Sequence, residues 1–260
     1  MTILEQLAEH ARERVAQAKR NNSLEKIKNL AYALPKGDFA FEEALKKQEL
    51  SFICECKKAS PSKGLIAEKF PCLEIARVYE AAGADCISVL TEPKWFLGKD
   101  DYLKEIAGKV SVPCLRKDFT VDEYMIYEAK LLGASAVLLI CSTLSEKELA
   151  EYIKICDSLG LSALVEAHNG QEVETAIAAG ARIIGVNNRN LKDFTVDTNN
   201  CRKLRRLVPE KILFVAESGI RTRKDIEALQ EIGVDAVLIG ETLMKAQDKG
   251  AKLRELQGFL

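Results

Sequence analysis

The sequence predicts a (β/α)8 barrel of the TIM-barrel type, and three observations lead to this fold class. A glycine followed within a few residues by an apolar run occurs four times, at Gly83, Gly133, Gly180 and Gly233, about 50 residues apart. Three further apolar runs lie between them and a fourth precedes them, and helical stretches separate the runs. Alternating strands and helices imply parallel strands with right-handed crossovers, and near-continuous apolar strands imply burial on both faces. A length of 260 residues suits one such barrel.

The expected elements follow from this pattern. Each of the four glycines should end a helix in the left-handed conformation, with strands within 81–90, 131–140, 178–186 and 231–240. The other strands are expected at 51–57, 112–119, 162–168 and 212–218. Helices are expected at 72–82, 122–132, 146–159, 170–179, 199–207 and 223–232.

The first 50 residues precede the first strand. Their pattern predicts helices at 3–19, 24–33 and 41–48. We expect residues 1–50 to be a helical extension that packs on a barrel of residues 51–260, so that 1–260 forms a single TIM-barrel domain. A doubly wound open sheet is the alternative fold. It would carry a G-x-G-x-x-G loop after the first strand, where this chain has ASPSKG.

Composition excludes several classes of function. Thirty-eight basic and 39 acidic residues give a net charge of −1, so we expect no nucleic-acid and no membrane partner. No apolar run reaches the roughly 20 residues of a membrane span, and the amphipathic start of mixed charge is not typical of a signal or transit peptide. Eight cysteines lie mostly in apolar runs, which favours a reduced, cytoplasmic protein. The Cys54-x-Cys56 pair has no second cluster, so no metal site is expected.

Polar residues gather at the ends of the expected strands, which in this fold surround the active site. Glu55 and Lys57 alternate on one strand and therefore share a face, where a buried charge pair is usually kept for chemistry or for an ion pair. The residues at the eight strand ends are Lys57, Glu92, Lys117, Ser142, Glu166, Asn187, Ser218 and Glu241.

Two of these residues suggest acid–base chemistry. Lys117, whose neighbours Arg116 and Asp118 should point to the other side, is either a solvated strand-end lysine, a general acid or a Schiff-base amine. Glu166 is either a general base or a partner for a lysine, and the sequence favours neither role.

The last two strand ends are typical of a phosphate site. Ser218, Gly219 and Gly240 provide a hydroxyl and glycine turns whose N–H groups can hold an anion, although the glycines could be simple turn formers. Glu241 would repel a phosphate unless its side chain turns away. The rings of Trp95, Phe96 and Phe119 could flank a ring-bearing substrate or only pack loops together.

From the first helix to Met244, the chain closely resembles the indole-3-glycerol phosphate synthase family. The motifs that carry the resemblance are KKASPSKG (57–64), SVLTE (88–92), LRKDF (115–119), YEAK (127–130), LLI (138–140), LVEAH (164–168), GVNNRNL (185–191), AESGI (216–220) and IGETLM (239–244). The resemblance implies ring closure of 1-(2-carboxyphenylamino)-1-deoxyribulose 5-phosphate to indole-3-glycerol phosphate in L-tryptophan biosynthesis. Carbon dioxide and water are lost, and no metal or organic cofactor is required.

The resemblance also implies residue roles. Lys117 is the general acid that protonates the ribulose carbonyl oxygen, and Lys57 contacts the substrate carboxylate. Glu166 and Glu55 transfer protons during dehydration, with the acid and base of that step left open among Lys57, Glu55 and Glu166. Asn187 orients the substrate, and Ser218 belongs to both the catalytic and the binding set. Further substrate contacts are Ser60, Pro61, Phe96, Phe119, Arg189, Glu217, Gly219, Gly240 and Glu241.

Two other functions compete with this interpretation. A Schiff-base aldolase would use Lys117 or Lys57 and would be trapped by borohydride. A catalytically silent sensor of phosphorylated ligands would have no reason to keep Lys57, Lys117 and Glu166 together. We expect a small phosphorylated substrate as the partner and a monomer or weak homodimer.

Overall fold

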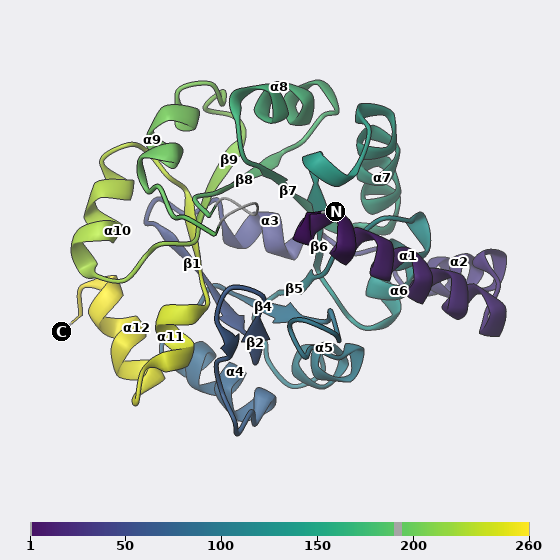
Figure 1. Cartoon of the computed structure of the whole chain (residues 1–260), viewed down its shortest axis with the longest axis horizontal. Helices are drawn as coiled ribbons and strands as arrows, with labels where there is room; N and C mark the ends of the chain where they lie inside the picture. Colours follow the sequence, from purple (N-terminus) through teal and green to yellow (C-terminus); the bar gives the residue numbers. More distant parts are fainter. Residues whose placement is uncertain (1, 190–193, 260) are drawn as a thin grey trace.

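The fold is described from a computed structural model that covers residues 2–189 and 194–259. Within these residues, eight parallel strands close into a barrel in the order β1-β10-β9-β8-β7-β6-β5-β4 (Figure 1). The strands are β1 (Ser51–Cys56), β4 (Cys86–Leu90), β5 (Cys114–Lys117), β6 (Ala136–Ile140), β7 (Ser162–Ala167), β8 (Ile183–Asn187), β9 (Leu213–Glu217) and β10 (Ala236–Ile239). Because β1 pairs with both β4 and β10, the barrel prediction is confirmed and the open-sheet alternative is wrong.

Helices surround the barrel, as Figure 1 shows. They are α4 (Cys72–Ala81), α5 (Asp100–Ala107), α6 (Glu123–Leu131), α7 (Glu146–Leu159), α8 (Gly170–Ala178), α9 (Asn199–Arg205), α10 (Arg223–Gln230), α11 (Glu241–Lys245) and α12 (Lys249–Gln257), with a short 3-10 turn, η1 (Cys141–Thr143). The four repeated glycines have φ between 72° and 91°, which confirms their predicted left-handed conformation. Helices α5, α11 and α12 were not among the predicted helices.

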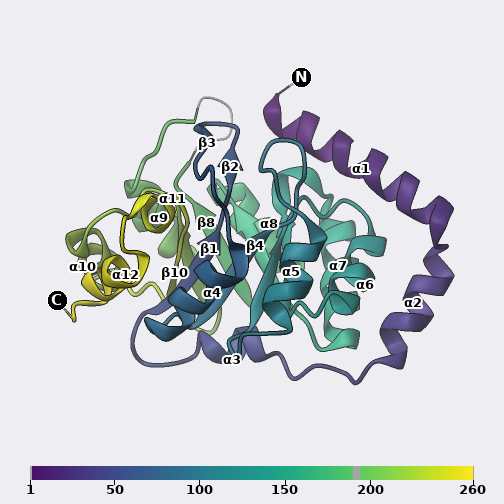
Figure 2. The same ribbon diagram turned by 90° about the horizontal axis from the view of Figure 1, so that it is seen from below.

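Helices of the N-terminal extension pack at both ends of the barrel. It consists of α1 (Ile3–Asn21), α2 (Leu24–Ala33) and α3 (Ala40–Ala44), the last shorter than the predicted 41–48. Figure 2 shows α3 at one end of the barrel and α1 at the other, beside a small hairpin of β2 (Ala59–Ser60) and β3 (Gly64–Leu65). One apolar cluster joins Leu7 of α1, the side chains inside the barrel, and Phe41 of α3. The barrel interior is therefore a packed core.

Polar contacts fix α1 to the rim of the barrel. His10 Nδ1 lies 3.2 Å from Glu92 Oε1 and Lys19 Nζ lies 2.7 Å from Asp122 Oδ2. Arg14 donates two hydrogen bonds, of 3.1 and 2.6 Å, to the carboxylate of Asp118. Since Asp118 directly follows Lys117, the helix is anchored beside the strand end that carries this lysine.

Three further expectations concern the whole chain. All eight cysteines are buried and free, as predicted for small apolar side chains. None of the described helices is both long enough and apolar enough to cross a membrane. The division into an extension of residues 1–50 and a barrel of residues 51–260 within one domain stays a prediction.

Candidate active site

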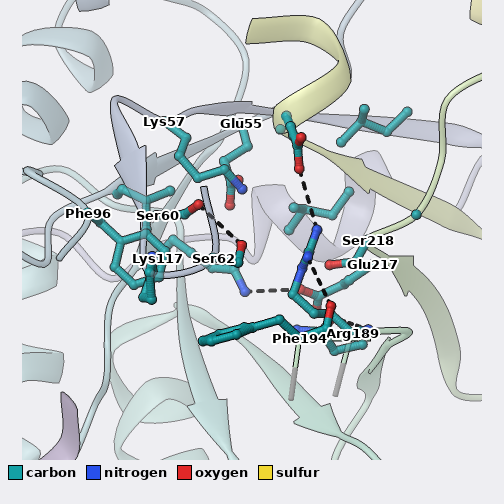
Figure 3. A pocket seen from close by; sticks show the side chains of 18 of the residues that line it. Glu55, Lys57, Ser60, Ser62, Phe96, Lys117, Arg189, Phe194, Glu217 and Ser218 are labelled. Carbon is teal, nitrogen blue, oxygen red and sulfur yellow. Dashed lines mark hydrogen bonds and ion pairs between the residues drawn. The ribbon is translucent and has the colours of Figure 1, made fainter. Parts of the chain in front are cut away.

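A cavity of about 390 Å³ opens at the carboxyl ends of the strands, where the side chains labelled in Figure 3 converge. Fourteen of the fifteen predicted site residues line it. They are Glu55, Lys57, Ser60, Pro61, Phe96, Lys117, Phe119, Asn187, Arg189, Glu217, Ser218, Gly219, Gly240 and Glu241. Glu166 lies behind this wall, in contact with Lys117. The strand ends thus bring together residues that are far apart in sequence, as the barrel prediction requires.

Lys117 bridges two buried carboxylates. Its Nζ donates hydrogen bonds of 3.0 Å to Glu166 Oε2 and 2.9 Å to Glu217 Oε2. Both glutamates lie at the carboxyl ends of their strands: Glu166 is the residue before the last of β7, and Glu217 ends β9, where it pairs with Asn187 of β8. Lys117 of β5 is therefore held in place from β7, two strands away, and from β9, on the opposite side of the barrel.

The three groups have very different pKa values. Burial alone would lower the pKa of Lys117, but the nearby carboxylates of Glu166, Glu217 and Glu55 outweigh it and raise that pKa. Burial disfavours the charged form of Glu166, yet Lys117 and His168 hold its pKa well below the usual range. Burial raises the pKa of Glu217 to about 7, since Lys117 only partly offsets it and Glu166 and Glu55 add to it. At neutral pH Glu166 is therefore ionised, whereas Glu217 takes up or releases its proton near pH 7.

Glu55 and Lys57 form the charge pair expected from their spacing. Lys57 Nζ lies 2.5 Å from Glu55 Oε2, and only 4% of the Glu55 side chain is exposed. The pair lies over the backbone of Gly240, where an added Cβ would collide with the Glu55 carboxylate. Gly240 thus has a steric reason to be glycine in addition to its place at the turn.

Of the three aromatic residues considered in the sequence, two line the cavity and one packs elsewhere. Phe96 and Phe119 line the cavity, with ring centroids 6.2 Å apart. Trp95 instead packs against His10 of α1.

Glu92 turns away from the cavity and accepts hydrogen bonds from the backbone N–H groups of Lys94, Trp95 and Phe96. The expectation that Glu92 joins the mouth is wrong, because it organises the loop that follows β4. Ser142, another predicted strand-end residue, lines a separate cavity.

The end of the cavity where a phosphate site was predicted has an unusual turn and a cluster of cations. Ser218 has φ of 68° and Gly219 has φ of 84°, and the left-handed Ser218 is uncommon for a residue with a side chain. Glu241 Oε1 lies 2.7 Å from Lys245 Nζ and 3.8 Å from Lys63 Nζ, and its Oε2 lies 3.5 Å from Arg189 Nη2. Burial acts against this carboxylate, but the three cations lower its pKa. The Glu241 charge is therefore compensated before any substrate binds.

Several residues of the site were not predicted from sequence. Lys63 and Lys245 lie in a loop and a helix, away from the strand ends that were searched, although Lys245 follows Glu241 by one helical turn. Ile3 and Leu7 line the cavity from α1, and their apolar helical spacing indicated only a packing face. The last two residues of the predicted GVNNRNL motif, 190 and 191, lie outside the described residues. Within the described chain, no cluster of three or more His, Cys, Asp or Glu side chains is arranged to hold a metal ion.

Comparisons with solved structures agree with the fold. Solved structures show the same fold: the 3-hexulose-6-phosphate synthase of Salmonella typhimurium aligns with a TM-score of 0.67 at 15% identity, covering 80% of this chain and 97% of that one. The thiamine phosphate pyrophosphorylase of Pyrococcus furiosus aligns at 0.60 and 17% identity, covering 84% and 96%. Fold and site together define a barrel enzyme whose cavity wall carries a lysine in contact with two buried glutamates.

Sequence relatives give the family. The family model of indole-3-glycerol phosphate synthase matches residues 4–256. The indole-3-glycerol phosphate synthase of Ruminiclostridium cellulolyticum is 60% identical over 98% of this chain and 99% of its own length. That of Lachnoclostridium phytofermentans is 52% identical over 99% and 100%. The chain belongs to the indole-3-glycerol phosphate synthase family, and it is a carboxy-lyase of tryptophan biosynthesis.

Proposed function

We propose that Lys117 is the general acid of the ring closure, in which a ring carbon of the anthranilate attacks the ribulose carbonyl. The ammonium of Lys117 gives its proton to the carbonyl oxygen as the carbon–carbon bond forms. The observation that carries this role is the double hydrogen bond from Lys117 Nζ to Glu166 and Glu217, which keeps the lysine protonated and fixed at the cavity wall.

The substrate lies between two anion sites. Its phosphate binds at Ser218, Gly219 and Gly240, and its carboxylate meets Lys57 on the other side. The rings of Phe96 and Phe119 enclose the anthranilate, and Asn187 orients the sugar chain. This orientation is supported by the positions of these residues on the cavity wall. Loss of carbon dioxide then restores aromaticity.

Dehydration needs a second round of proton transfer. Glu55 lies on the cavity wall next to Lys57, and Glu166 reaches the cavity through Lys117. We assign proton transfer in this step to these two carboxylates together with Lys57. Loss of the substrate carboxylate as carbon dioxide consumes one proton overall, so a proton from solvent restores the ammonium form of Lys117 between its two carboxylates before the next turnover.

The protonated state of Lys117 argues against a Schiff-base aldolase. Imine formation requires a neutral amine, whereas the carboxylates around Lys117 raise its pKa. The smaller proposals about the chain are a cytoplasmic location, a monomer or weak homodimer, and no nucleic-acid or membrane partner.

A fluorescence assay of indole-product formation tests the function. The purified chain is expected to convert 1-(2-carboxyphenylamino)-1-deoxyribulose 5-phosphate, and borohydride added during turnover is expected to trap no adduct. A protein without activity on this substrate would overturn the proposal, and a borohydride adduct on Lys117 would favour the aldolase.

A further inference from the structure

The carboxylate of Glu166 contacts two cations from opposite sides. Its Oε2 accepts a hydrogen bond of 3.0 Å from Lys117 Nζ, on the side of the cavity. Its Oε1 lies 3.2 Å from Nε2 of His168, on the far side, in an electrostatic contact whose geometry is not that of a hydrogen bond. Only 3% of the Glu166 side chain is exposed. The group assigned to proton transfer is thus held from behind by a histidine to which no role has so far been given.

A second carboxylate holds His168. Its Nδ1 lies 3.1 Å from Glu172 Oε2, so each ring nitrogen meets a carboxylate oxygen. Glu172 is fixed in turn, since its Oε2 accepts the backbone N–H of His168 and its Oε1 accepts the side-chain amide of Asn169. From α9, Asn200 donates a hydrogen bond of 3.2 Å to the carbonyl of His168. The end of β7 and the start of α8 therefore form a rigid support for the imidazole.

The imidazole lies between the buried site and a second cavity. This cavity of about 430 Å³ is lined by His168 and Glu172 and shares Asn187 and Arg189 with the active-site cavity. Exposure rises from 3% for the Glu166 side chain to 17% for His168 and 20% for Glu172. Because His168 is more exposed than Glu166, a positive charge on His168 loses less hydration than a charge inside the barrel would lose.

We infer that His168 is a positioning residue for the reaction: supported by Glu172, its imidazolium keeps Glu166 ionised and holds its carboxylate against Lys117. This inference rests on the role of Glu166 proposed above. Lys117 cannot do this alone, because it shares its ammonium with Glu217. His168 supplies the second positive charge that a cluster of one lysine and two glutamates lacks.

The groups facing this centre come from several elements. Lys117 of β5 and Glu217 of β9 face Glu166, while Glu172 of α8 and the thiol of Cys141 at η1 lie on the side of His168. Burial lowers the pKa of His168, but the two glutamates outweigh it and raise it to about 10. His168 is therefore charged at neutral pH, and Glu166 has a lowered pKa with Lys117 and His168 as its causes.

The pH profile of His168→Gln tests the inference by activity. Glutamine keeps a hydrogen-bond donor and removes the charge, so the pKa of Glu166 should rise and the acid limb of kcat should move to higher pH. We expect the ratio of kcat at pH 7.5 to kcat at pH 5.5 to grow about tenfold over the wild-type ratio, with KM little changed. His168→Lys, which restores a cation, should recover part of the shift.

The other histidine of the chain provides the matched control. His10 also meets a carboxylate, that of Glu92, but on α1 and away from Lys117. His10→Gln should leave the acid limb where it is in the wild type. A profile for His168→Gln that runs parallel to the wild type at every pH would show a merely structural role and would overturn the inference.

Nitrogen-15 NMR of the unmodified protein gives a readout that needs neither activity nor a variant. The chain has two histidines, so the imidazole spectrum is simple to assign. His168 is expected to keep the signals of a doubly protonated ring up to pH 8. A neutral ring at pH 7 would overturn the inference. An inactive protein with a charged His168 would instead contradict the proposed function while the electrostatic contact remained.

Discussion

The ends of β7 and β9 each present a buried glutamate to the same ammonium group, yet the two regions hold protons differently. Glu166, at the end of β7, has a lowered pKa, whereas the pKa of Glu217, at the end of β9, is raised to about 7. Both side chains are 3% exposed or less and both lie about 3 Å from Lys117 Nζ. Burial and the shared lysine therefore cannot explain the difference.

The neighbours on the far side explain it. Behind Glu166 lies His168, a second cation. Behind Glu217 lies the backbone of Gly185, and Glu217 Oε1 has no hydrogen-bond partner among the described residues. Two neighbouring cations keep the pKa of a carboxyl group low. A single cation that is shared with another carboxylate does not offset burial, and the pKa of that group stays raised. Lys117 thus contacts one glutamate that stays ionised, Glu166, and one that takes up or releases a proton near pH 7, Glu217.

Removal of the shared cation should have the largest effect. Lys117→Ala takes away the proposed general acid and leaves two carboxylates side by side without their shared cation, so kcat should fall about 1,000-fold. Steady-state kinetics with the fluorescence assay measure the loss. A variant with nearly wild-type kcat would contradict the general-acid role.

The two glutamates should differ when each is replaced by its neutral isostere. Glu166→Gln removes a charge that is present during catalysis, and kcat should fall about 100-fold. Glu217→Gln resembles the protonated glutamic acid that already exists near pH 7, so its loss should be about tenfold or less. The pair of variants is measured in parallel at pH 7. Equal losses of kcat in the two variants would contradict the difference in charge between Glu166 and Glu217.

A smaller effect is expected at the glycine behind Glu217. A Cβ at Gly185 would collide with Glu217 Oε1 and would push the carboxylate out of its place. Gly185→Ala should therefore cost about 1–3 kcal/mol in the free energy of unfolding, the usual cost of overpacking. Urea denaturation measures this cost. Gly180→Ala is a control of similar size change without any collision, although its positive φ adds strain of its own.

The smallest predicted effect is a change in pH dependence. With its pKa near 7, Glu217 should give the wild-type enzyme an inflection of two- to threefold in kcat/KM near neutral pH. Below that pH Glu217 is protonated, and above it Glu217 becomes an anion beside Glu166. Glu217→Gln cannot titrate and should lose the inflection. An unchanged inflection in the variant would assign it to another group.

Much of this site could be predicted from sequence, for a physical reason. Parallel strands bring their carboxyl ends to one rim, so Lys57, Lys117 and Asn187 could be placed together from the strand pattern alone. Glu92 was misplaced because strand periodicity says nothing about a side chain that folds back onto the N–H groups of its own loop. Trp95 was left open because its partner, His10, lies on α1, far away in the sequence.

The contrast between Glu166 and Glu217 could not be read from sequence. It depends on which group lies behind each carboxylate, and both neighbours come from positions with ordinary local roles: His168 follows a strand, and Gly185 is a small residue inside one. The helix α1 was likewise predicted as an element, but its pairs with Glu92 and Asp118 are contacts across the fold. Three-dimensional packing decides these features.

Carbon-13 NMR titration of the glutamate carboxyl groups tests the central claim most directly. Glu166→Gln and Glu217→Gln assign the two signals in protein that carries labelled glutamate. The account predicts that the Glu217 signal titrates near pH 7 while the Glu166 signal stays that of a carboxylate down to about pH 4. Signals that titrate together, or a Glu166 that takes up its proton before Glu217 as the pH falls, would contradict it.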